Sequence, residues 1–475
     1  MESLDFKLEE LYAQRDFIQS QIEQLEIEKQ SSIKSYITLG DAIYIDSLHL
    51  SKNLQDELKL LAQFDNPQVK ILENLRKPLY NIPRVIKSYE QTDTQLILPR
   101  GLMRNVIELF KLNNLDISYV DKRFYKKEKF PKILFNLRDQ QQYCIDKILK
   151  KDFSLCIAPP GFGKTLIGAK IIELRSANTL VIVNKNMLLD QWIDRFVNYF
   201  GYKKKDIGYL GKSKNCLNNI LDVATMQSLK NNIDIIKNYS FVIVDECHHI
   251  PALTFEKIIK SFQGKFILGL SATPNRKDGM QPLIYQQLGG IAYEVKSKKK
   301  STNKVMIIES DFQSEVDNFA DLLTELINND KRNDLIIQQI VKYKNRKVLL
   351  LTDRIEHIEN LELILKSLGI EFVAIHGSLK KKEQIENMKK VSTASLVLAT
   401  TSYFGEGIDF PHLNTVIFAT PISYYGRLVQ YLGRIGRDGS DCLAIDILDI
   451  QNRFTLSSYK KRKDGYKQLH YIRTK

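Results

Sequence analysis

Short, wholly apolar segments alternate with helix-like stretches from about residue 137 to the end of the chain. Segments such as Leu180–Val183, Phe241–Val244, Leu396–Ala399 and Val416–Ala419 contain no polar residue. Continuous apolar strands separated by helices are typical of a parallel sheet that helices cover on both faces. The pattern stops near a lysine-rich stretch at 296–301 and then restarts. We therefore predict two successive α/β domains, over residues 136–297 and 298–475.

Two further segments precede these domains. In residues 1–30, leucines and isoleucines recur at spacings of three and four, which predicts an acidic amphipathic helix of about three heptads. Two interpretations stay open for this helix: it packs on its own domain, or it forms a coiled coil with a partner or with a second copy. Residues 31–135 are expected to form a small α+β accessory module, with a strand and turn at 95–101 and a short helix at Val106–Leu112.

The charge balance constrains the partners of the chain. Seventy Lys and Arg stand against 56 Asp and Glu, a net charge of +14. Such a surplus favours a polyanionic partner, with nucleic acid ahead of an anionic membrane. The five cysteines form no CxxC pair, so we expect neither a disulfide framework nor a zinc site. No apolar run spans a bilayer and the N-terminus does not resemble a signal peptide, which predicts a cytoplasmic protein or one in a viral or host nucleic-acid compartment.

A phosphate-binding loop is predicted at 158–165, because the sequence APPGFGKT follows an apolar strand and opens a helix. Successive backbone N–H groups and the helix N-terminus would cradle the phosphates of ATP. Lys164 would reach the β- and γ-phosphates, and the Thr165 hydroxyl would bind Mg²⁺. Ala158 stands where the strict pattern has glycine. The other expected contacts of the loop are Pro160, Gly161, Phe162 and Gly163.

An acidic pair ends another apolar strand. Asp245 is expected to hold Mg²⁺ through water, and Glu246 to act as the general base for the attacking water. His248 follows two residues later. Ser271 and Thr273 end the next strand, where their hydroxyls could bind Asp245 or His248. We expect these three residues to couple the state of the nucleotide to the rest of the chain.

The second domain carries candidates for completing the site. Arg434 and Arg437 are three residues apart, which predicts that both lie on one face of a helix. Two guanidinium groups that face the γ-phosphate from another domain would act as arginine fingers. Gly407 and Asp409, in the segment 405–409, fit a loop between nucleotide and nucleic acid, with Asp409 against the ribose.

In this order, the motifs resemble those of superfamily 2 helicases of the DExH kind, nearest the XPB-like group, from about Leu137 to Tyr466. Similar modules occur in bacterial conflict systems and large DNA viruses. The resemblance implies two RecA-like domains that close on ATP, with Gln141 as the reader of the adenine base. Tyr431 departs from the arginine that is common at its place. Trp192 is either a core residue or a platform on which bases stack.

The resemblance also implies a nucleic-acid strand across both domains, bound through its backbone and largely independent of sequence. Its phosphate contacts would be Thr225, Gln227, Arg354 and Thr400, and Gln430 would join the coupling residues. The implied function is an ATP-dependent helicase or translocase on DNA or RNA. The alternative is the motor subunit of a restriction or repair nuclease, with the nuclease on a separate subunit because the chain has no convincing PD…ExK arrangement. A non-catalytic, nucleotide-switched scaffold is disfavoured by the intact Lys164, Glu246, Arg434 and Arg437.

Overall fold

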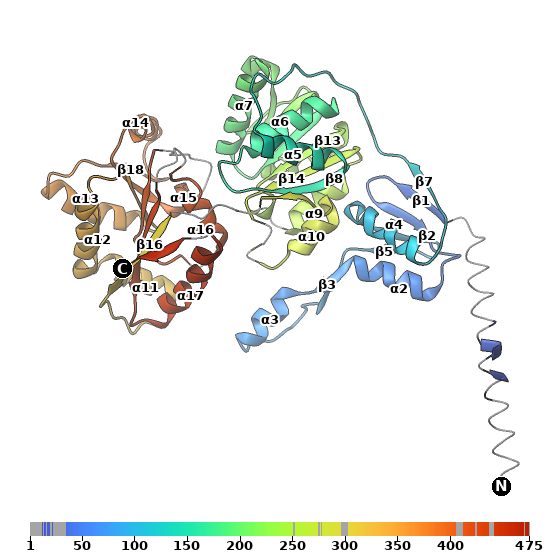
Figure 1. Ribbon diagram of the computed structural model, residues 1–475, viewed down its shortest axis with the longest axis horizontal. Coiled ribbons are helices and arrows are strands. Elements are labelled where there is room, and N and C mark those ends of the chain that lie inside the picture. The colour runs from blue at the N-terminus through green and yellow to red at the C-terminus, as the bar shows by residue number, and fades with distance from the viewer. Residues whose placement is uncertain are drawn as a thin grey trace, which may run out of the picture.

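The computed structural model describes residues 12, 14, 15, 17–19, 21, 35–249, 252–273, 276, 278–295, 303–404, 412–422, 425–436, 441–469 and 471–474. Figure 1 shows them as an accessory module followed by two α/β domains. In the predicted N-terminal helix, the described residues between 12 and 21 are helical and exposed, and the remainder of that prediction lies outside the described residues. Among the helices of the described part of the chain, none is both long enough and apolar enough to span a bilayer.

The accessory module is built on a five-stranded sheet in the order β5-β6-β2-β1-β7, in which only β1 and β7 run parallel. Its helices cover the sheet with buried Leu54, Leu58, Val106 and Phe110. The predicted short helix is present but begins earlier, at Met103. The elements are β1 (Ser35–Leu39), β2 (Ile43–Asp46), α2 (Lys52–Leu61), β3 (Gln63–Asp65), α3 (Pro67–Asn74), β4 (Val85–Lys87), β5 (Glu90–Gln91), β6 (Gln95–Leu98), η1 (Arg100–Leu102), α4 (Met103–Leu112) and β7 (Ile117–Asp121).

A buried arginine fastens this module to the first α/β domain. Arg100 is fully buried, donates from Nη1 to the carbonyl of Gly264 at 3.2 Å, and lies over the rings of Phe262 and Phe153 at 4.5 and 5.3 Å. Burial lowers its pKa to about 9, so the guanidinium stays charged at neutral pH. A Cβ on the neighbouring Gly101 would lie 2.5 Å from a backbone atom of α10. The module therefore packs closely on the first domain.

The first domain is an eight-stranded sheet in the order β11-β10-β12-β9-β13-β14-β8-β15, parallel except for β11. Its strands are β8 (Phe153–Ile157), β9 (Thr179–Val183), β10 (Gly208–Gly211), β11 (Lys214–Cys216), β12 (Leu221–Thr225), β13 (Phe241–Asp245), β14 (Phe266–Ser271) and β15 (Ile291–Glu294). Its helices are α5 (Asp139–Leu149), α6 (Lys164–Arg175), α7 (Asn186–Phe200), η2 (Lys204–Asp206), α8 (Met226–Lys230), η3 (Ile233–Asn238), η4 (Cys247–His249), α9 (Ala252–Lys260) and α10 (Gln281–Leu288).

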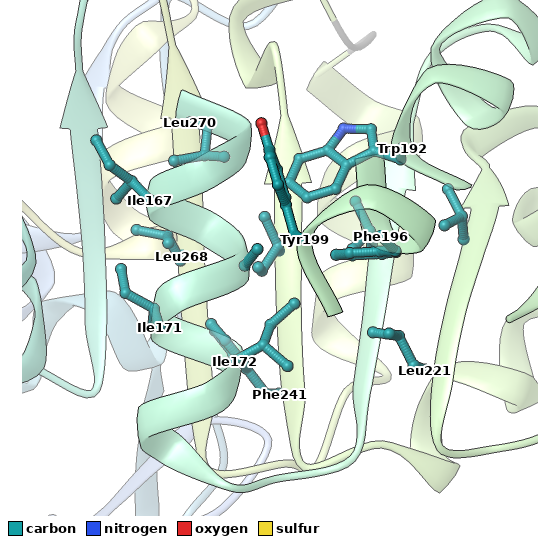
Figure 2. Packing of buried hydrophobic residues seen from close by; sticks show 14 of the residues in the cluster. Ile167, Ile171, Ile172, Trp192, Phe196, Tyr199, Leu221, Phe241, Leu268 and Leu270 are labelled. Carbon is teal, nitrogen blue, oxygen red and sulfur yellow. The ribbon is translucent and has the colours of Figure 1, made fainter. Parts of the chain in front are cut away.

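Helices cover both faces of this sheet, as the apolar strands predict. On one face, Ile171 of α6 and Trp192 and Phe196 of α7 pack against Phe241 and Leu268 of the sheet (Figure 2). A second buried cluster fills the opposite face under α9 and α10. The five cysteines are free thiols.

The second domain is a seven-stranded, wholly parallel sheet among the described residues, in the order β18-β19-β17-β20-β21-β16-β22. Its strands are β16 (Lys304–Ser310), β17 (Val348–Thr352), β18 (Val373–Ile375), β19 (Leu396–Thr400), β20 (Thr415–Phe418), β21 (Leu443–Asp449) and β22 (Ile472–Thr474). Its helices are α11 (Phe319–Ile327), α12 (Asp330–Lys342), α13 (Ile355–Ser367), α14 (Lys381–Val391), α15 (Thr401–Phe404), α16 (Tyr425–Leu432) and α17 (Arg453–Gln468).

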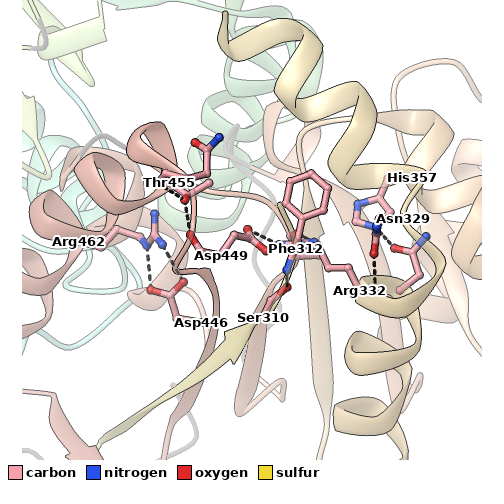
Figure 3. A network of polar contacts seen from close by, with 12 residues as sticks. Ser310, Phe312, Asn329, Arg332, His357, Asp446, Asp449, Thr455 and Arg462 are labelled. Atoms are coloured by element: carbon pink, nitrogen blue, oxygen red, sulfur yellow. Dashed lines mark hydrogen bonds and ion pairs between the residues drawn. The ribbon is translucent and has the colours of Figure 1, made fainter. Parts of the chain in front are cut away.

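Two buried ion pairs tie helices of this domain to β21 (Figure 3). Arg332 of α12 pairs with Asp449 at 2.7 Å, and Arg462 of α17 pairs with Asp446 at 2.8 Å. Arg332 also donates to the carbonyl of Ala419 at 2.7 Å. Because a buried charge without its partner is strongly destabilising, these pairs fix where α12 and α17 sit against the strands.

Candidate ATP site and interdomain interface

The predicted phosphate loop connects β8 to α6, and its turn depends on glycine. Gly163 has φ +95°, and a Cβ there would lie 2.5 Å from Nε2 of Gln141. Lys164 is the first residue of α6. Its Nζ donates to the carbonyl of Ala158 at 3.0 Å and lies 3.4 Å from Oε1 of Glu246. The loop lysine and the acidic pair, which are far apart in the sequence, therefore meet at one point.

Gln141 is fixed to this loop. Its Oε1 accepts a hydrogen bond from the backbone N–H of Arg138 at 2.9 Å, and its Nε2 donates to the carbonyl of Phe162 at 2.7 Å. Arg138 donates to the same carbonyl at 2.6 Å and lies over the Phe162 ring. Tyr293 stacks on that ring with centroids 6.2 Å apart. The sequence alone did not single out Arg138 or Tyr293, although Arg138 lies only three residues before Gln141.

The two carboxylates sit in different surroundings. Asp245 is buried at the end of β13, where Oδ2 accepts from the Trp192 indole at 2.8 Å and Oδ1 from the Glu246 N–H at 2.9 Å. Burial, followed by the charge of Glu246, raises the pKa of Asp245 to about 6. Glu246 has φ +46°, a sparsely populated conformation for a non-glycine residue that often marks functional sites. The strand end thus directs one carboxylate inward and the other towards Lys164.

Trp192 is a core residue with a second task. Its side chain is 2% exposed, so it offers no ring face for stacking with a base. Its indole N–H instead holds one oxygen of Asp245, a contact that the sequence did not reveal. The indole is a donor only, so it favours the ionised carboxylate.

The four predicted coupling residues lie together. Nδ1 of His248 is 2.8 Å from Oγ of Ser271 and 3.5 Å from Oε2 of Glu246. The Thr273 N–H donates to Oγ of Ser271 at 3.2 Å. On its other side, Nε2 of His248 is 3.4 Å from Nε2 of Gln430 in the second domain. A continuous chain of polar contacts therefore joins the acidic pair to the second domain.

A close contact also joins the phosphate loop to the segment after α16. A Cβ on Gly433 would lie 3.0 Å from Cδ of Pro160. Arg434 is the next residue, and its guanidinium donates to the Phe404 carbonyl and lies 5.7 Å from the Phe404 ring centroid. The structure thus places the backbone beside Arg434 against the ATP loop.

The prediction that both arginines lie on one face of a helix is wrong for Arg434. Helix α16 ends at Leu432, and Arg434 is in a turn. The physical reason is local: Gly433 follows the last helical residue, and Gly436 has φ +64°, a conformation that does not continue a helix. Arg437, Gly407 and Asp409 lie outside the described residues, so their predicted roles stay predictions.

Tyr431, which stands where an arginine is common in the resembling helicases, is a buried structural residue. Its ring packs against Phe404 and Phe418, and its hydroxyl donates to the Thr401 carbonyl at 3.1 Å. Burial raises its pKa to about 12, so it is neutral. Tyr431 therefore connects α16 to the residue that follows Thr400.

The predicted nucleic-acid contacts sit where parallel strands end. Thr225 ends β12 and caps α8, two residues before the exposed Gln227. Thr400 ends β19 and pairs with Thr352 of β17, and the exposed Arg354 follows that strand. Carboxyl ends of parallel strands share one edge of a sheet, which is where ligands bind in such folds.

Two family models match the chain in order. Residues 134–276 match the model described as type III restriction enzyme, res subunit, and residues 331–439 match the helicase conserved C-terminal domain. The first match contains the phosphate loop and the acidic pair, and the second contains the segment after α16.

Individual proteins agree with these matches. The DNA 3'-5' translocase XPB2 of Sulfurisphaera tokodaii is 24% identical over 395 residues, covering 70% of this chain and 88% of the relative. A protein of Acanthamoeba polyphaga mimivirus whose name describes it as an ATP-dependent RNA helicase is 27% identical over 368 residues, covering 70% of this chain and 68% of the relative.

A solved structure shares the arrangement of the α/β domains. S. cerevisiae Dbp5, bound to RNA and ADP BeF3, aligns with a TM-score of 0.53 at 14% identity, covering 71% of this chain and 89% of that chain. At that identity the likeness concerns the fold, which is that of two RecA-like domains. Both family models and these relatives agree: the chain carries the two domains of a nucleic-acid helicase and is similar to superfamily 2 helicases, an XPB-like translocase among them.

Proposed function

We propose that this helicase hydrolyses ATP between its two RecA-like domains, assigned to residues 136–297 and 298–475, and uses the closing of that interface to move along a nucleic-acid strand. The observation that carries the proposal is the polar chain from Glu246 through His248 to Gln430, with distances of 3.5 and 3.4 Å. His248 contacts Glu246 in the first domain and Gln430 in the second. A change of charge at the acidic pair during hydrolysis would therefore alter the contact between His248 and Gln430.

Each residue of the ATP site has a separate task in this proposal. Lys164 neutralises charge on the phosphates, and Glu246 polarises the attacking water. Thr165 and Asp245 offer the hydroxyl and carboxylate oxygens that Mg²⁺ prefers. When bound there, Mg²⁺ would neutralise charge that develops on the phosphates. Trp192 supports the site by holding the Asp245 carboxylate in its ionised form.

The proposal is tested by ATP hydrolysis with single-stranded DNA, duplex DNA and RNA in parallel. We expect at least one of them to raise the rate above that of the chain alone, and the order of the three would establish the preferred nucleic acid. A rate that none of the three changes would contradict the proposal.

Binding of nucleic acid is expected to depend steeply on salt and little on sequence. The net charge is +14, and the proposed contacts Thr225, Gln227, Arg354 and Thr400 suit phosphates rather than base edges. Each neutralised phosphate contributes roughly 0.7–0.9 to the slope of log affinity against log salt concentration. Titrations of unrelated sequences at several salt concentrations check this, and a salt-independent affinity would contradict it.

Arg437→Ala is expected to bind ATP nearly as well as the parent but to lose stimulated hydrolysis by roughly 10³–10⁵-fold, the range of arginine fingers. The reason is that the first domain supplies most ground-state contacts, whereas the second supplies its charge only on closure. Arg437→Lys should not restore the rate, since an ammonium lacks the planar fork of a guanidinium. The prediction is checked by measuring ATP affinity and nucleic-acid-stimulated phosphate release for the parent, Arg437→Ala and Arg437→Lys. Turnover of Arg437→Ala within a few-fold of the parent would place the arginine on a solvated surface.

A second candidate is the motor subunit of a restriction or repair nuclease, which the match of residues 134–276 to the res-subunit model favours. In that case the nuclease belongs to another subunit. The purified chain, incubated with circular DNA, ATP and Mg²⁺, should then leave the DNA uncut, whereas cutting by the chain alone would place the nuclease within it.

A further inference from the structure

An arm formed by residues 63–87 projects from the accessory module. It consists of the two-stranded β3–β4 ladder, helix α3 and the loop between α3 and β4. Figure 1 shows it reaching away from the five-stranded sheet of the module. None of the residues of α3 is buried. Since α3 contributes no buried side chain to a hydrophobic core, its exposed surface is available for binding.

The junction between β3 and α3 is held by contacts of Asn66 and Pro67. Asn66 caps α3 by accepting from the Gln68 N–H at 3.0 Å, and its Nδ2 donates to the Pro83 carbonyl at 2.8 Å. Pro67 lies against the first domain, because a Cβ on Gly279 would be 2.8 Å from its Cβ. Gly279 has φ +74°, a backbone conformation that favours glycine. The arm therefore contacts the first domain at a residue that follows Ser271 by eight positions and Thr273 by six in the sequence.

The surface of the arm is basic. All its lysines and arginines are exposed, and among the described residues none of them forms an ion pair with a carboxylate within 4.0 Å. Two acidic residues, Asp65 and Glu73, stand against the five bases, which leaves a net charge of +3. The bases are Lys70, Arg76, Lys77, Arg84 and Lys87.

The loop of the arm presents an aromatic ring to solvent. Tyr80 is 86% exposed, more than any other large apolar residue of the described chain. Pro78 and Pro83 flank it and restrict the backbone of the loop. Exposed aromatic rings beside basic side chains are the combination with which proteins bind unpaired nucleic acid, by stacking and by phosphate contacts.

We propose that the arm is a second nucleic-acid contact, in which Arg76 and Lys77 bind phosphates and the Tyr80 ring stacks on a base where single and double strands meet. Bases inside a duplex are stacked on both faces, so a ring on a projecting loop can reach only an unpaired base or the last pair of a duplex. The proposal rests on the helicase function proposed above. It adds a contact outside both RecA-like domains, on the accessory module.

The test compares three substrates: a forked duplex, a single strand, and a relaxed closed circular duplex that offers neither an end nor an unpaired base. Tyr80→Ala should weaken binding of the fork and the single strand by roughly tenfold, within the range that stacking contributes, and leave the circle unchanged. Tyr80→Phe keeps the ring face and should bind like the parent. Basal ATP hydrolysis without nucleic acid should be the same in all arm variants.

The charged part of the arm is tested with a double variant and a matched control. Arg76→Ala with Lys77→Ala should weaken binding of all three substrates and reduce the salt slope by roughly 1.4–1.8, since two phosphate contacts are lost. Lys342→Ala with Lys344→Ala removes the same charge from an exposed site that precedes β17, at the opposite edge of the second sheet from Thr400. That control should leave affinity and slope nearly unchanged.

Each other outcome contradicts the arm contact. If Tyr80→Ala weakens the circle as much as the fork, the ring does not stack on bases. If the Lys342→Ala/Lys344→Ala control loses as much affinity as the Arg76→Ala/Lys77→Ala variant, the loss reflects the overall charge of the chain and not a contact made by the arm. If the arm variants bind all substrates like the parent but change the sedimentation of the chain, the arm is a protein-docking surface. A parent whose ATP hydrolysis responds to no nucleic acid would contradict the proposed function itself, whatever the arm does.

Discussion

Lys164→Ala should abolish ATP hydrolysis, with a loss of at least about 10²–10³-fold in kcat. Lys164 Nζ lies between the Ala158 carbonyl and Glu246, at 3.0 and 3.4 Å, at the start of the helix that follows the phosphate loop. Removing a preorganised donor from a site where charge develops in the transition state costs roughly this factor. Phosphate release at saturating ATP and nucleic acid measures it.

Lys170→Ala is the matched control for this change. Lys170 belongs to the same helix, α6, but pairs with Glu173 at 2.7 Å, away from the loop. A partly exposed pair of this kind contributes about 0–1 kcal/mol to stability, so hydrolysis should stay within a few-fold of the parent. Near-normal turnover in Lys164→Ala, or an equal loss in Lys170→Ala, would contradict the assignment of the ATP site.

Glu246→Gln should still bind ATP while its hydrolysis falls by roughly 10²–10⁴-fold, the usual contribution of a general base. The amide keeps the shape of the side chain but cannot accept a proton from water. Asp245 keeps its hydrogen bond from Trp192, so the proposed Mg²⁺ ligand remains in place. The variant should therefore stay closed on nucleic acid with ATP bound, which slows its dissociation.

Two measurements on Glu246→Gln separate the roles of the carboxylates: ATP affinity in the presence of Mg²⁺, and the rate of dissociation from a labelled strand with ATP. Asp245→Asn serves as the comparison, because it alters the proposed metal ligand and should weaken binding of ATP with Mg²⁺. If Glu246→Gln lost ATP binding and Asp245→Asn retained it, the two roles would have to be exchanged.

The sequence determined those features that depend on neighbouring residues. Continuous apolar runs, such as Val348–Leu351, predict strands buried on both faces, and helices cover both faces of each large sheet. The strand before Ala158, the glycines and the helix after Lys164 predict a phosphate loop, because that turn requires left-handed backbone at Gly161 and Gly163. Such patterns are local, so they can be read before any contact is known.

The tertiary structure decided which distant residues meet. The bond from Trp192 to Asp245, the contact of Pro160 with Gly433 and the stacking of Tyr293 on Phe162 each join segments far apart in the sequence. The spacing of apolar residues in a helix or strand predicts which face is buried. It does not predict which hydrogen-bond donor meets which acceptor once the elements are packed together.

Two results depended on the conformation of the chain rather than on its pattern. A spacing of three predicted Arg434 and Arg437 on one helix face, yet α16 ends at Leu432. For the arm of residues 63–87 the sequence predicted only part of a small α+β module. Its arrangement arises because Asn66 and Pro67 hold the junction of β3 with α3, while no residue of α3 is buried. Local sequence predicts the helices and strands. The packing of the first domain against the module and against the second domain determined which of their side chains face a ligand.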